Sequence, residues 1–465
     1  MKRILIIITA SVLIQLSSGC TQDFLDAKPS TNIVQPVTLD EFQKLLDNSD
    51  FINKGVGLGI LAADEYVYSS DAIWKSLSSA TSRNSYIWAK DLYEGMETDH
   101  WDVPFTAIFY ANNVLAGLDN IDVNALNINE WNKTKGWALF VRAYAYYELV
   151  NNFAPFYDET TASTDLGVPL RLRPSIDELA QRSTVKENFY RIFTDLKQAT
   201  PLLDLGIPAA RSRPSKAAAH ALFARIYLNM RNYTKAEMHA DTCLSLYDSL
   251  IDYNTISKTA ANPFTYNHDE QIYAKNTPAD AGYISSGNNP YVDVSPDLIS
   301  LYEPNDLRLV LYYKKQSNGT YDMKGRYFGG GSYPYVGLAT DEVYLIKAEC
   351  LARKGESDLA MDVVNQLRIK RWDPNATSPA KPFENLTATN AEDALAKVLI
   401  ERRKELVWRG TRWNDLRRFN KEGANITLTR TINGETYTLL PNSPKYIFPI
   451  PDNEINLSGI QQNLR

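Results

Sequence analysis

The feature that most constrains the fold is a pattern of small and apolar residues that two segments of the chain share. In residues 218–247 the pattern is occupied by Ala224, Tyr227, Ala236, Ala240 and Cys243. In residues 342–368 the same offsets are occupied by Ala348, Leu351, Ala360, Val364 and Leu367. A pattern repeated at this spacing predicts two similar pairs of antiparallel helices, in which the small residues let the helices approach closely.

Two further helical regions extend the pattern. In residues 136–153, Ala143 and Tyr146 have the same spacing as Ala224 and Tyr227, so this segment is predicted to be the first helix of a pair. Residues 183–199 are predicted to be its return helix. A fourth helical region spans 391–419. The chain is therefore predicted to be mostly α, a tetratricopeptide-like scaffold of stacked helix pairs at about 130–250 and 338–420, whose faces accept insertions. Because Ala-rich amphipathic helices are common, an unrelated helical bundle is the alternative.

The start of the chain reads as a leader that ends at a cysteine. Lys2 and Arg3 precede an apolar run, and small residues lead up to Cys20. This order predicts a lipoprotein signal peptide over 1–19, lipidation of Cys20 and a tether over 20–37. An ordinary signal peptide followed by an incidental thiol is the alternative. A single domain is expected over 38–465, beginning with a helix that Thr38 and Glu41 cap.

Charge and cysteine content exclude some classes of function. Removal of the leader takes the formal net charge from −6 to about −8, which argues against binding to phosphate backbones, so no nucleic-acid partner is expected. Cys243 and Cys350 fall within helical patterns. They are predicted to be free buried thiols, with a disulfide between them as the alternative.

Aromatic residues gather in two insertions, at about 60–100 and 252–338. The chain has 28 Tyr and 8 Trp, and many of them fall in these segments, where helical periodicity fails and Gly, Pro, Asn and Ser are frequent. A loop region as long as the second insertion is usually functional or disordered, and its aromatic content favours order. The insertions are therefore the expected place for a ligand site.

Catalysis is not predicted. The four histidines are scattered without an HExxH or CxxC motif, so no metal site and no cofactor are expected, and His220 and His239 are predicted to be packing residues. A glycosidase needs only two acids at the right separation, which leaves open the pairs Asp64 and Glu65, Glu97 and Asp99, and Asp269 and Glu270.

The arginine-rich segment 401–418 alternates acids with bases. Glu405 stands four residues before Arg409, the spacing of ion pairs on one helix face. Structural salt bridges are the predicted role of this segment, rather than an anion site.

Several segments, in this order, resemble the SusD/RagB family of surface lipoproteins of Bacteroidota. They are SGCTQDFLD, RAYAYYELVNNF, GVPL, STVKENFYRIFTDLKQA, RPSKAAAHALFARIYL, TDEVYLIKAECLARKG, ERRKELVWRGTRWNDLRR and KYIFPIPDNEINLSGIQQN. The resemblance covers essentially the whole mature chain. It departs from the family at Arg409, where an acidic residue is usual, and in the loop after Phe153, which lacks the usual glycine-containing turn.

The resemblance implies a non-catalytic, outer-membrane protein exposed at the cell surface and held by its lipid alone. Such a protein binds carbohydrate and passes it to a SusC-like TonB-dependent transporter. Peptide capture, as in RagB, and a protein-assembly scaffold are the alternatives. The family places its ligand among such insertions, but the contacts vary between members.

We therefore predict the site from residue chemistry, because a sugar ring offers an apolar face and a rim of hydroxyl groups. The candidate stacking rings are Trp74, Tyr86, Trp88, Tyr283, Tyr291, Tyr333 and Tyr335. The candidate polar contacts are Asp64, Asn84, Asn288 and Asn289. Local loop packing is the alternative for each ring, and a half-buried strand is a further alternative for Tyr86 and Trp88. Four other tryptophans are predicted to be buried: Trp101, Trp137, Trp408 and Trp413.

Overall fold

Helix pairs form the body of the protein, as the repeated pattern predicts. The computed structural model describes residues 36–175, 177–284, 289, 291–324, 327–329 and 333–465, with only the backbone of Tyr283. The long helices are α3 (Leu39–Leu46), α8 (Asp99–Leu118), α9 (Ile128–Phe153), α10 (Val185–Leu202), α11 (Lys216–Asn229), α12 (Tyr233–Leu246), α16 (Thr340–Lys354), α17 (Ser357–Arg368), α18 (Ala391–Glu405) and α19 (Arg412–Lys421).

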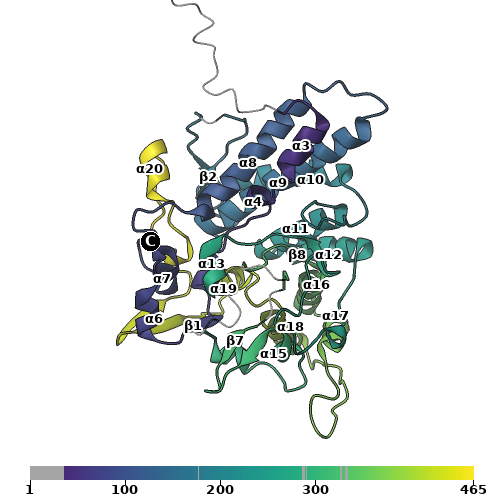
Figure 1. Cartoon of the computed structure of the whole chain (residues 1–465), viewed down its shortest axis with the longest axis vertical. Coiled ribbons are helices and arrows are strands. Elements are labelled where there is room, and N and C mark those ends of the chain that lie inside the picture. Colours follow the sequence, from purple (N-terminus) through teal and green to yellow (C-terminus); the bar gives the residue numbers. More distant parts are fainter. Residues whose placement is uncertain (1–35, 176, 285–288, 290, 325–326, 330–332) are drawn as a thin grey trace, which may run out of the picture.

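The pairs α9–α10, α11–α12 and α16–α17 each pack side by side, and α12 packs on α16. Figure 1 shows α3, α8, α9 and α10 in the upper half of the molecule and the remaining pairs below them. Helix α18 then packs on α16 and α17. The mostly α, tetratricopeptide-like architecture is confirmed.

Small residues line the helix contacts. Ala236, Ala240 and Cys243 form the buried face of α12, and the Cys243 thiol lies 3.3 Å from the carbonyl oxygen of Ala217 on α11. Cys243 and Cys350 are free and buried, as predicted. His220 and His239 are half-buried at the α11–α12 contact, where the His239 ring stacks on Phe223, which confirms their packing role.

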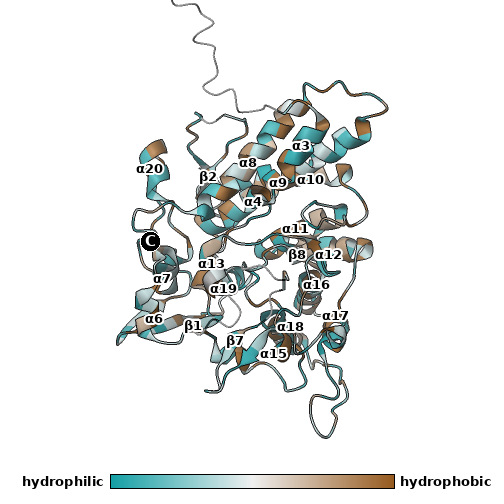
Figure 2. Ribbon diagram, in the orientation of Figure 1, coloured by the Kyte–Doolittle hydropathy of each residue, from teal (hydrophilic) through white to brown (hydrophobic). Residues whose placement is uncertain are grey.

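Helix ends follow the local sequence. The Thr38 hydroxyl accepts from the Glu41 amide and the Glu41 carboxylate accepts from the Thr38 amide, the capping box that the sequence predicts. The same box opens α10 with Thr184 and Glu187. Figure 2 shows polar and apolar residues alternating around α3 and α8, as expected for helices that bury one side.

Short elements make up the insertions and the ends of the chain. The shorter helices are α4 (Ser49–Ile52), α5 (Leu58–Ala62), α6 (Asp71–Ser76), α7 (Ala80–Tyr86), α13 (Ala279–Ile284), α14 (Pro296–Ile299), α15 (Arg308–Leu311) and α20 (Asp452–Ser458), with 3₁₀ turns at Tyr253–Thr255, Ile369–Arg371 and Pro444–Tyr446. Among the described residues, no helix combines the length and the apolar character that a membrane crossing requires.

The described residues form five two-stranded antiparallel sheets, of which β1–β5 and β4–β8 join distant parts of the chain. The strand pairs are β1 (Tyr66–Tyr68) with β5 (Val292–Val294), β2 (Leu166–Pro169) with β3 (Arg182–Thr184), β4 (Gln271–Tyr273) with β8 (Leu338–Ala339), β6 (Tyr313–Lys315) with β7 (Tyr321–Met323), and β9 (Leu428–Ile432) with β10 (Glu435–Leu439). The β1–β5 pair joins the two aromatic insertions.

Candidate functional site

The two aromatic insertions meet along the β1–β5 pair. Tyr68 lies opposite Val292, and beyond the sheet the Ser69 amide donates to the carbonyl oxygen of Tyr291 at 3.1 Å. A second contact joins α7 to α13, where the Ser79 hydroxyl donates to the Asp280 carboxylate at 3.2 Å. Segments that are about 200 residues apart in sequence thus lie side by side.

Two of the predicted stacking residues in these segments keep exposed surface. Tyr291, beside Ser69, is 46% exposed. Helix α6 begins at Asp71, with the Ser70 hydroxyl accepting from the Ile73 amide, and it carries the half-buried Trp74. The indole N–H of Trp74 donates to the Arg83 carbonyl at 3.0 Å, which fixes the ring in place. We call Trp74 and Tyr291 the aromatic face.

Three other predicted rings are buried, and their assignment as stacking surfaces is wrong. Tyr86 is 4% exposed, Trp88 1% and Tyr335 2%. The Arg430 guanidinium lies over the Tyr86 ring at 3.8 Å and over the Trp88 ring at 4.8 Å. The Trp88 indole N–H also donates to the Ala62 carbonyl at 3.0 Å. These rings form the core of their own loops, because a long loop needs buried apolar area to hold its shape.

The Tyr335 ring is covered in the same way. Its hydroxyl contacts the carbonyl oxygens of Tyr273 and Leu338, and the Arg409 guanidinium lies 4.7 Å from the ring centre. The strand alternative for Tyr86 and Trp88 is also wrong. Tyr86 ends helix α7, and Trp88 has a φ of 53°, a left-handed conformation outside any strand.

The remaining ring candidates are less informative. Tyr333 is half-buried in the second insertion. The side chain of Tyr283, on α13, lies outside the described residues, as do Asn288 and the predicted lipidation site Cys20. The four tryptophans expected in the core are buried, with exposures of 1–5%: Trp101, Trp137, Trp408 and Trp413.

The polar candidates serve mainly to hold the insertions together. The buried Asn84 amide donates to the Glu94 carboxylate at 3.0 Å. Asn289 is 8% exposed, and its side-chain oxygen accepts from the Tyr291 amide at 3.1 Å, which orients the backbone of the aromatic face. Asp64 accepts from Arg412 at 2.7 and 2.8 Å and from Arg403 at 3.2 Å.

Asp64 and Glu65 are adjacent acids with opposite pKa shifts. Burial alone would raise the pKa of Asp64, but the Arg412 and Arg403 guanidinium groups hold that pKa at about 2. Burial raises the pKa of Glu65 to about 8, although its carboxylate accepts from the Trp408 amide at 3.0 Å. Asp64 is therefore held in ion pairs at a half-buried position, and Glu65 lies in the interior of the protein.

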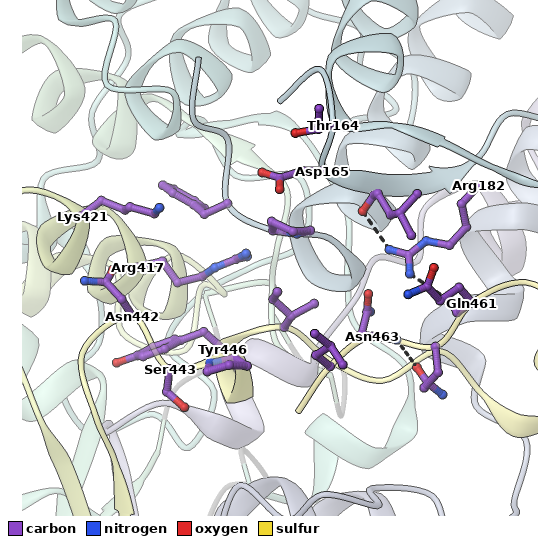
Figure 3. A pocket seen from close by; sticks show the side chains of 17 residues that line it. Thr164, Asp165, Arg182, Arg417, Lys421, Asn442, Ser443, Tyr446, Gln461 and Asn463 are labelled. Atoms are coloured by element: carbon purple, nitrogen blue, oxygen red, sulfur yellow. Dashed lines mark hydrogen bonds between the residues drawn. The ribbon is translucent and has the colours of Figure 1, made fainter. Parts of the chain in front are cut away.

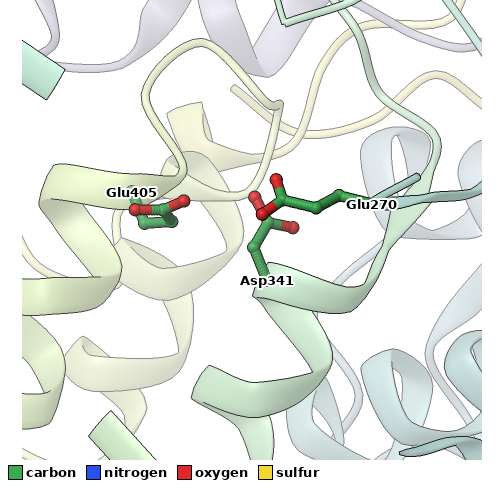
Figure 4. Close-up of side chains that lie close together, drawn as sticks. All are labelled: Glu270, Asp341 and Glu405. Atoms are coloured by element: carbon green, nitrogen blue, oxygen red, sulfur yellow. The ribbon is translucent and has the colours of Figure 1, made fainter. Parts of the chain in front are cut away.

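One buried group of acids has the composition of a cation site. Glu270, Asp341 and Glu405 each place an oxygen within 4.8 Å of the others. Figure 4 shows them converging from α16, α18 and the segment before β4. Arginines already occupy these oxygens: Arg371 bridges Glu270 and Glu405 at 2.7 Å each, and Arg409 lies 2.9 Å from Asp341.

This arrangement corrects the predicted pair of Glu405 and Arg409. Helix α18 ends at Glu405, so Arg409 no longer follows the helix and turns to Asp341, while Glu405 binds Arg371 and Arg308. Burial raises the pKa values of Glu270 and Asp341. The structural role predicted for the arginine-rich segment is confirmed, because the acids and bases of this interior neutralise one another.

One cavity of the described residues lies away from the aromatic insertions. A cavity of about 410 Å³ opens between the segment after α9, helix α19 and the C-terminal residues 442–464 (Figure 3). None of the predicted rings lines this cavity, which we call the C-terminal cavity. Sequence reasoning missed its lining residues, because they come from four separated segments that share no motif.

Comparisons with known proteins agree with this architecture. A family model described as starch-binding and associating with the outer membrane matches residues 23–228, and a model of the SusD family matches residues 303–464. The chain belongs to the SusD/RagB family. The family is thus one of carbohydrate-binding proteins of the outer membrane.

Individual SusD relatives are distant. SusD-like protein P2 of Formosa agariphila is 25% identical over 382 residues, which cover 70% of this chain and 72% of that protein. A SusD superfamily protein from Bacteroides thetaiotaomicron is 21% identical, with a TM-score of 0.70, and the match covers 92% of this chain and 100% of that one. A SusD-like carbohydrate binding protein from Bacteroides vulgatus is 18% identical, with a TM-score of 0.68, and the match covers 91% and 97%.

Proposed function

We propose that this protein captures glycan at the cell surface and delivers it to a SusC-like TonB-dependent transporter, without catalysis. The observation that carries the proposal is the aromatic face. Trp74 and Tyr291 come from the two insertions that the β1–β5 pair joins; Trp74 is half-buried and Tyr291 is 46% exposed, which supports the proposal. A flat ring suits the apolar C–H face of a sugar, and neighbouring polar groups suit its hydroxyls.

Weak binding is expected from such a face. Two or three rings and a few hydrogen bonds, each contributing on the order of 1 kcal/mol, give a binding free energy of about −4 to −6 kcal/mol. That range corresponds to a dissociation constant of roughly millimolar to tens of micromolar. A ligand held this weakly is released readily to a transporter.

The absence of catalysis is part of the proposal. Three of the six acids named as glycosidase candidates are used structurally: Asp64 binds two arginines, Glu65 is buried, and Glu270 binds Arg371. Lipidation of Cys20 would hold the protein at the outer membrane, with residues 20–37 as the tether.

The proposal is tested with the mature chain beginning after Cys20. Affinity gels that contain individual polysaccharides should retard the protein for at least one glycan, and Trp74→Ala should abolish that retardation while the variant stays folded by circular dichroism. Binding to peptides with no retardation by any glycan would instead indicate a RagB-like peptide carrier. Retardation that is unchanged in both Trp74→Ala and Tyr291→Ala would remove the aromatic face as the site.

A further inference from the structure

The C-terminal cavity has the size of a ligand site. Its volume of about 410 Å³ falls in the range of pockets that hold small ligands, and it has room for one or two sugar rings. Its wall combines apolar surface from Pro155, Phe156 and Pro444 with the amide side chains of Asn442 and Gln461. Figure 3 shows Asn442 and Gln461, together with Arg182, Arg417 and Lys421, arranged around the hollow.

The end of helix α9 explains why arginines line this cavity. The last carbonyls of a helix have no partner within the helix. Arg417 donates to the carbonyl oxygens of Asn151 and Ala154, and the Asn463 amide donates to that of Phe153 at 2.8 Å. Because α9 ends inside the protein, side chains must satisfy these carbonyls. Two of the side chains that do so carry a positive charge: Arg417, and Arg182, which donates to the carbonyl oxygen of Phe153 at 3.4 Å.

Arg182 completes this wall from strand β3. Its guanidinium donates to the carbonyl oxygens of Gly167, Leu166 and Gln461 at 2.7–2.9 Å. Burial lowers the pKa of Arg182 to about 10 and that of Arg417 to about 9, so both remain charged at neutral pH. In the described part of the chain, neither guanidinium forms an ion pair with a carboxylate. Both donate to backbone carbonyls, and the Arg417 guanidinium also lies 4.8 Å from the centre of the Phe156 ring.

The charges of the cavity therefore do not balance. Lys421 adds a third positive group, which forms an ion pair with Asp158 at 3.5 Å, and Asp165 is the one carboxylate among the described lining residues. Three positive groups thus face two carboxylates, which leaves one positive charge in excess. The carbonyl end of α9 offsets only about half a charge. An electropositive wall remains in a partly enclosed space, where solvent screens charge less than at an open surface.

We propose that the C-terminal cavity is a second glycan-binding site, which takes the carboxylate or sulfate group of an acidic sugar. The assignment of the ligand as a sugar rests on the proposed function; the requirement for a negative group rests on the charges of the cavity alone. Lys421, on the exposed rim, and Arg417, at the wall, would approach the anion, while Asp165 opposes it.

Two substitutions test the proposal without removing the arginines that cap α9: one removes a positive charge from the cavity and the other removes a negative charge. Lys421→Gln should weaken binding of an acidic sugar roughly two- to fivefold, and Asp165→Asn should strengthen it by a similar factor. The amide oxygen introduced at position 165 still accepts from the Thr161 hydroxyl, as the carboxylate does at 2.6 Å. Lys354→Gln is the matched control, because Lys354 is an exposed lysine on α16 outside the cavity.

The probes are oligogalacturonate and alginate oligosaccharides for the carboxylate, a sulfated galactan oligosaccharide for the sulfate, and methyl-esterified oligogalacturonate as the neutral match. Isothermal titration calorimetry should show binding of at least one acidic probe, shifted in opposite directions by Lys421→Gln and Asp165→Asn and unchanged by Lys354→Gln. The acidic probe that binds identifies the group.

Three results would overturn the proposal: no acidic probe binds, the ester binds as tightly as the acid, or the two variants bind like the unmodified protein. An acidic probe lost in Trp74→Ala but unaffected by Lys421→Gln would place the ligand on the aromatic face instead. Retention of neutral glycans with no charge effect would leave the proposed function intact and remove only the second site.

Discussion

Trp74 and Trp88 lie in the same insertion, fourteen residues apart, and have opposite environments. Trp88 is 1% exposed beneath the Arg430 guanidinium, whereas Trp74 is half-buried on helix α6. Both indole N–H groups donate to backbone carbonyls. The comparison teaches that the rings of one aromatic-rich insertion have two environments: some lie in the core, and others keep part of their surface exposed, which a ligand site requires.

The largest expected effect comes from removing the buried ring. Trp88→Ala should destabilise the protein by about 3–5 kcal/mol, because it leaves a large cavity under Arg430. Trp74→Ala should cost only about 1–2 kcal/mol, since part of that ring already contacts water. Chemical denaturation of both variants measures the difference. Equal destabilisation by the two substitutions would contradict the division between core rings and presented rings.

A second prediction compares how two acids of the first insertion, the buried Glu65 and the half-buried Asp64, make stability depend on pH. The pKa of Glu65 is raised by burial, so the folded state holds its proton more tightly than the unfolded state does, and stability should fall as pH rises from about 4.5 to about 8. The pKa of Asp64 is held at about 2, so its contribution is present above about 4 and is lost as pH falls towards 2.

Thermal unfolding across pH separates these two acids. Glu65→Gln should remove the loss of stability between about pH 4.5 and 8 while leaving the loss below pH 4, and Asp64→Asn should do the reverse. If Glu65→Gln leaves the loss of stability between about pH 4.5 and 8 unchanged, the carboxylate of Glu65 is not the buried titrating group of this loop.

A smaller effect is expected at the aromatic face itself. Tyr291→Ala should weaken glycan binding roughly two- to tenfold, the equivalent of about 0.5–1.5 kcal/mol for one ring contact, with little change in stability because the side chain is 46% exposed. Calorimetric titration with the glycan that is retained best measures this change. Tyr291→Phe keeps the ring plane and should bind like the unmodified protein; a loss equal to that of Tyr291→Ala would assign the role to the hydroxyl instead.

The helix pairs were predictable from sequence because their signals are local. Ala236, Ala240 and Cys243 repeat at helical spacing, and the capping box of Thr38 and Glu41 lies within four residues. The pairing of Glu405 was not predictable, since it depends on where α18 ends: one turn further and Arg409 would have shared its face. Contacts set by the ends of elements depend on tertiary packing that local spacing does not encode.

The site was predictable only as a region. Composition pointed to the two insertions, and β1–β5 joins them, but ring type did not separate Trp74 from Trp88 or Tyr291 from Tyr335. The deciding partners are Arg430 and Arg409, which lie far away in the sequence and cover the buried rings. The C-terminal cavity escaped sequence analysis for the same reason, since Arg182 and Arg417 meet only because α9 ends between them.

The most direct test of the central claim is the glycan affinity of the double variant Trp74→Ala/Tyr291→Ala compared with Tyr190→Ala. Tyr190 is a 74% exposed ring on α10, outside both insertions, so it controls for the loss of an exposed aromatic side chain. The account predicts at least tenfold weaker binding in the double variant and unchanged binding in Tyr190→Ala. Equal affinities in the folded double variant and the unmodified protein would contradict it.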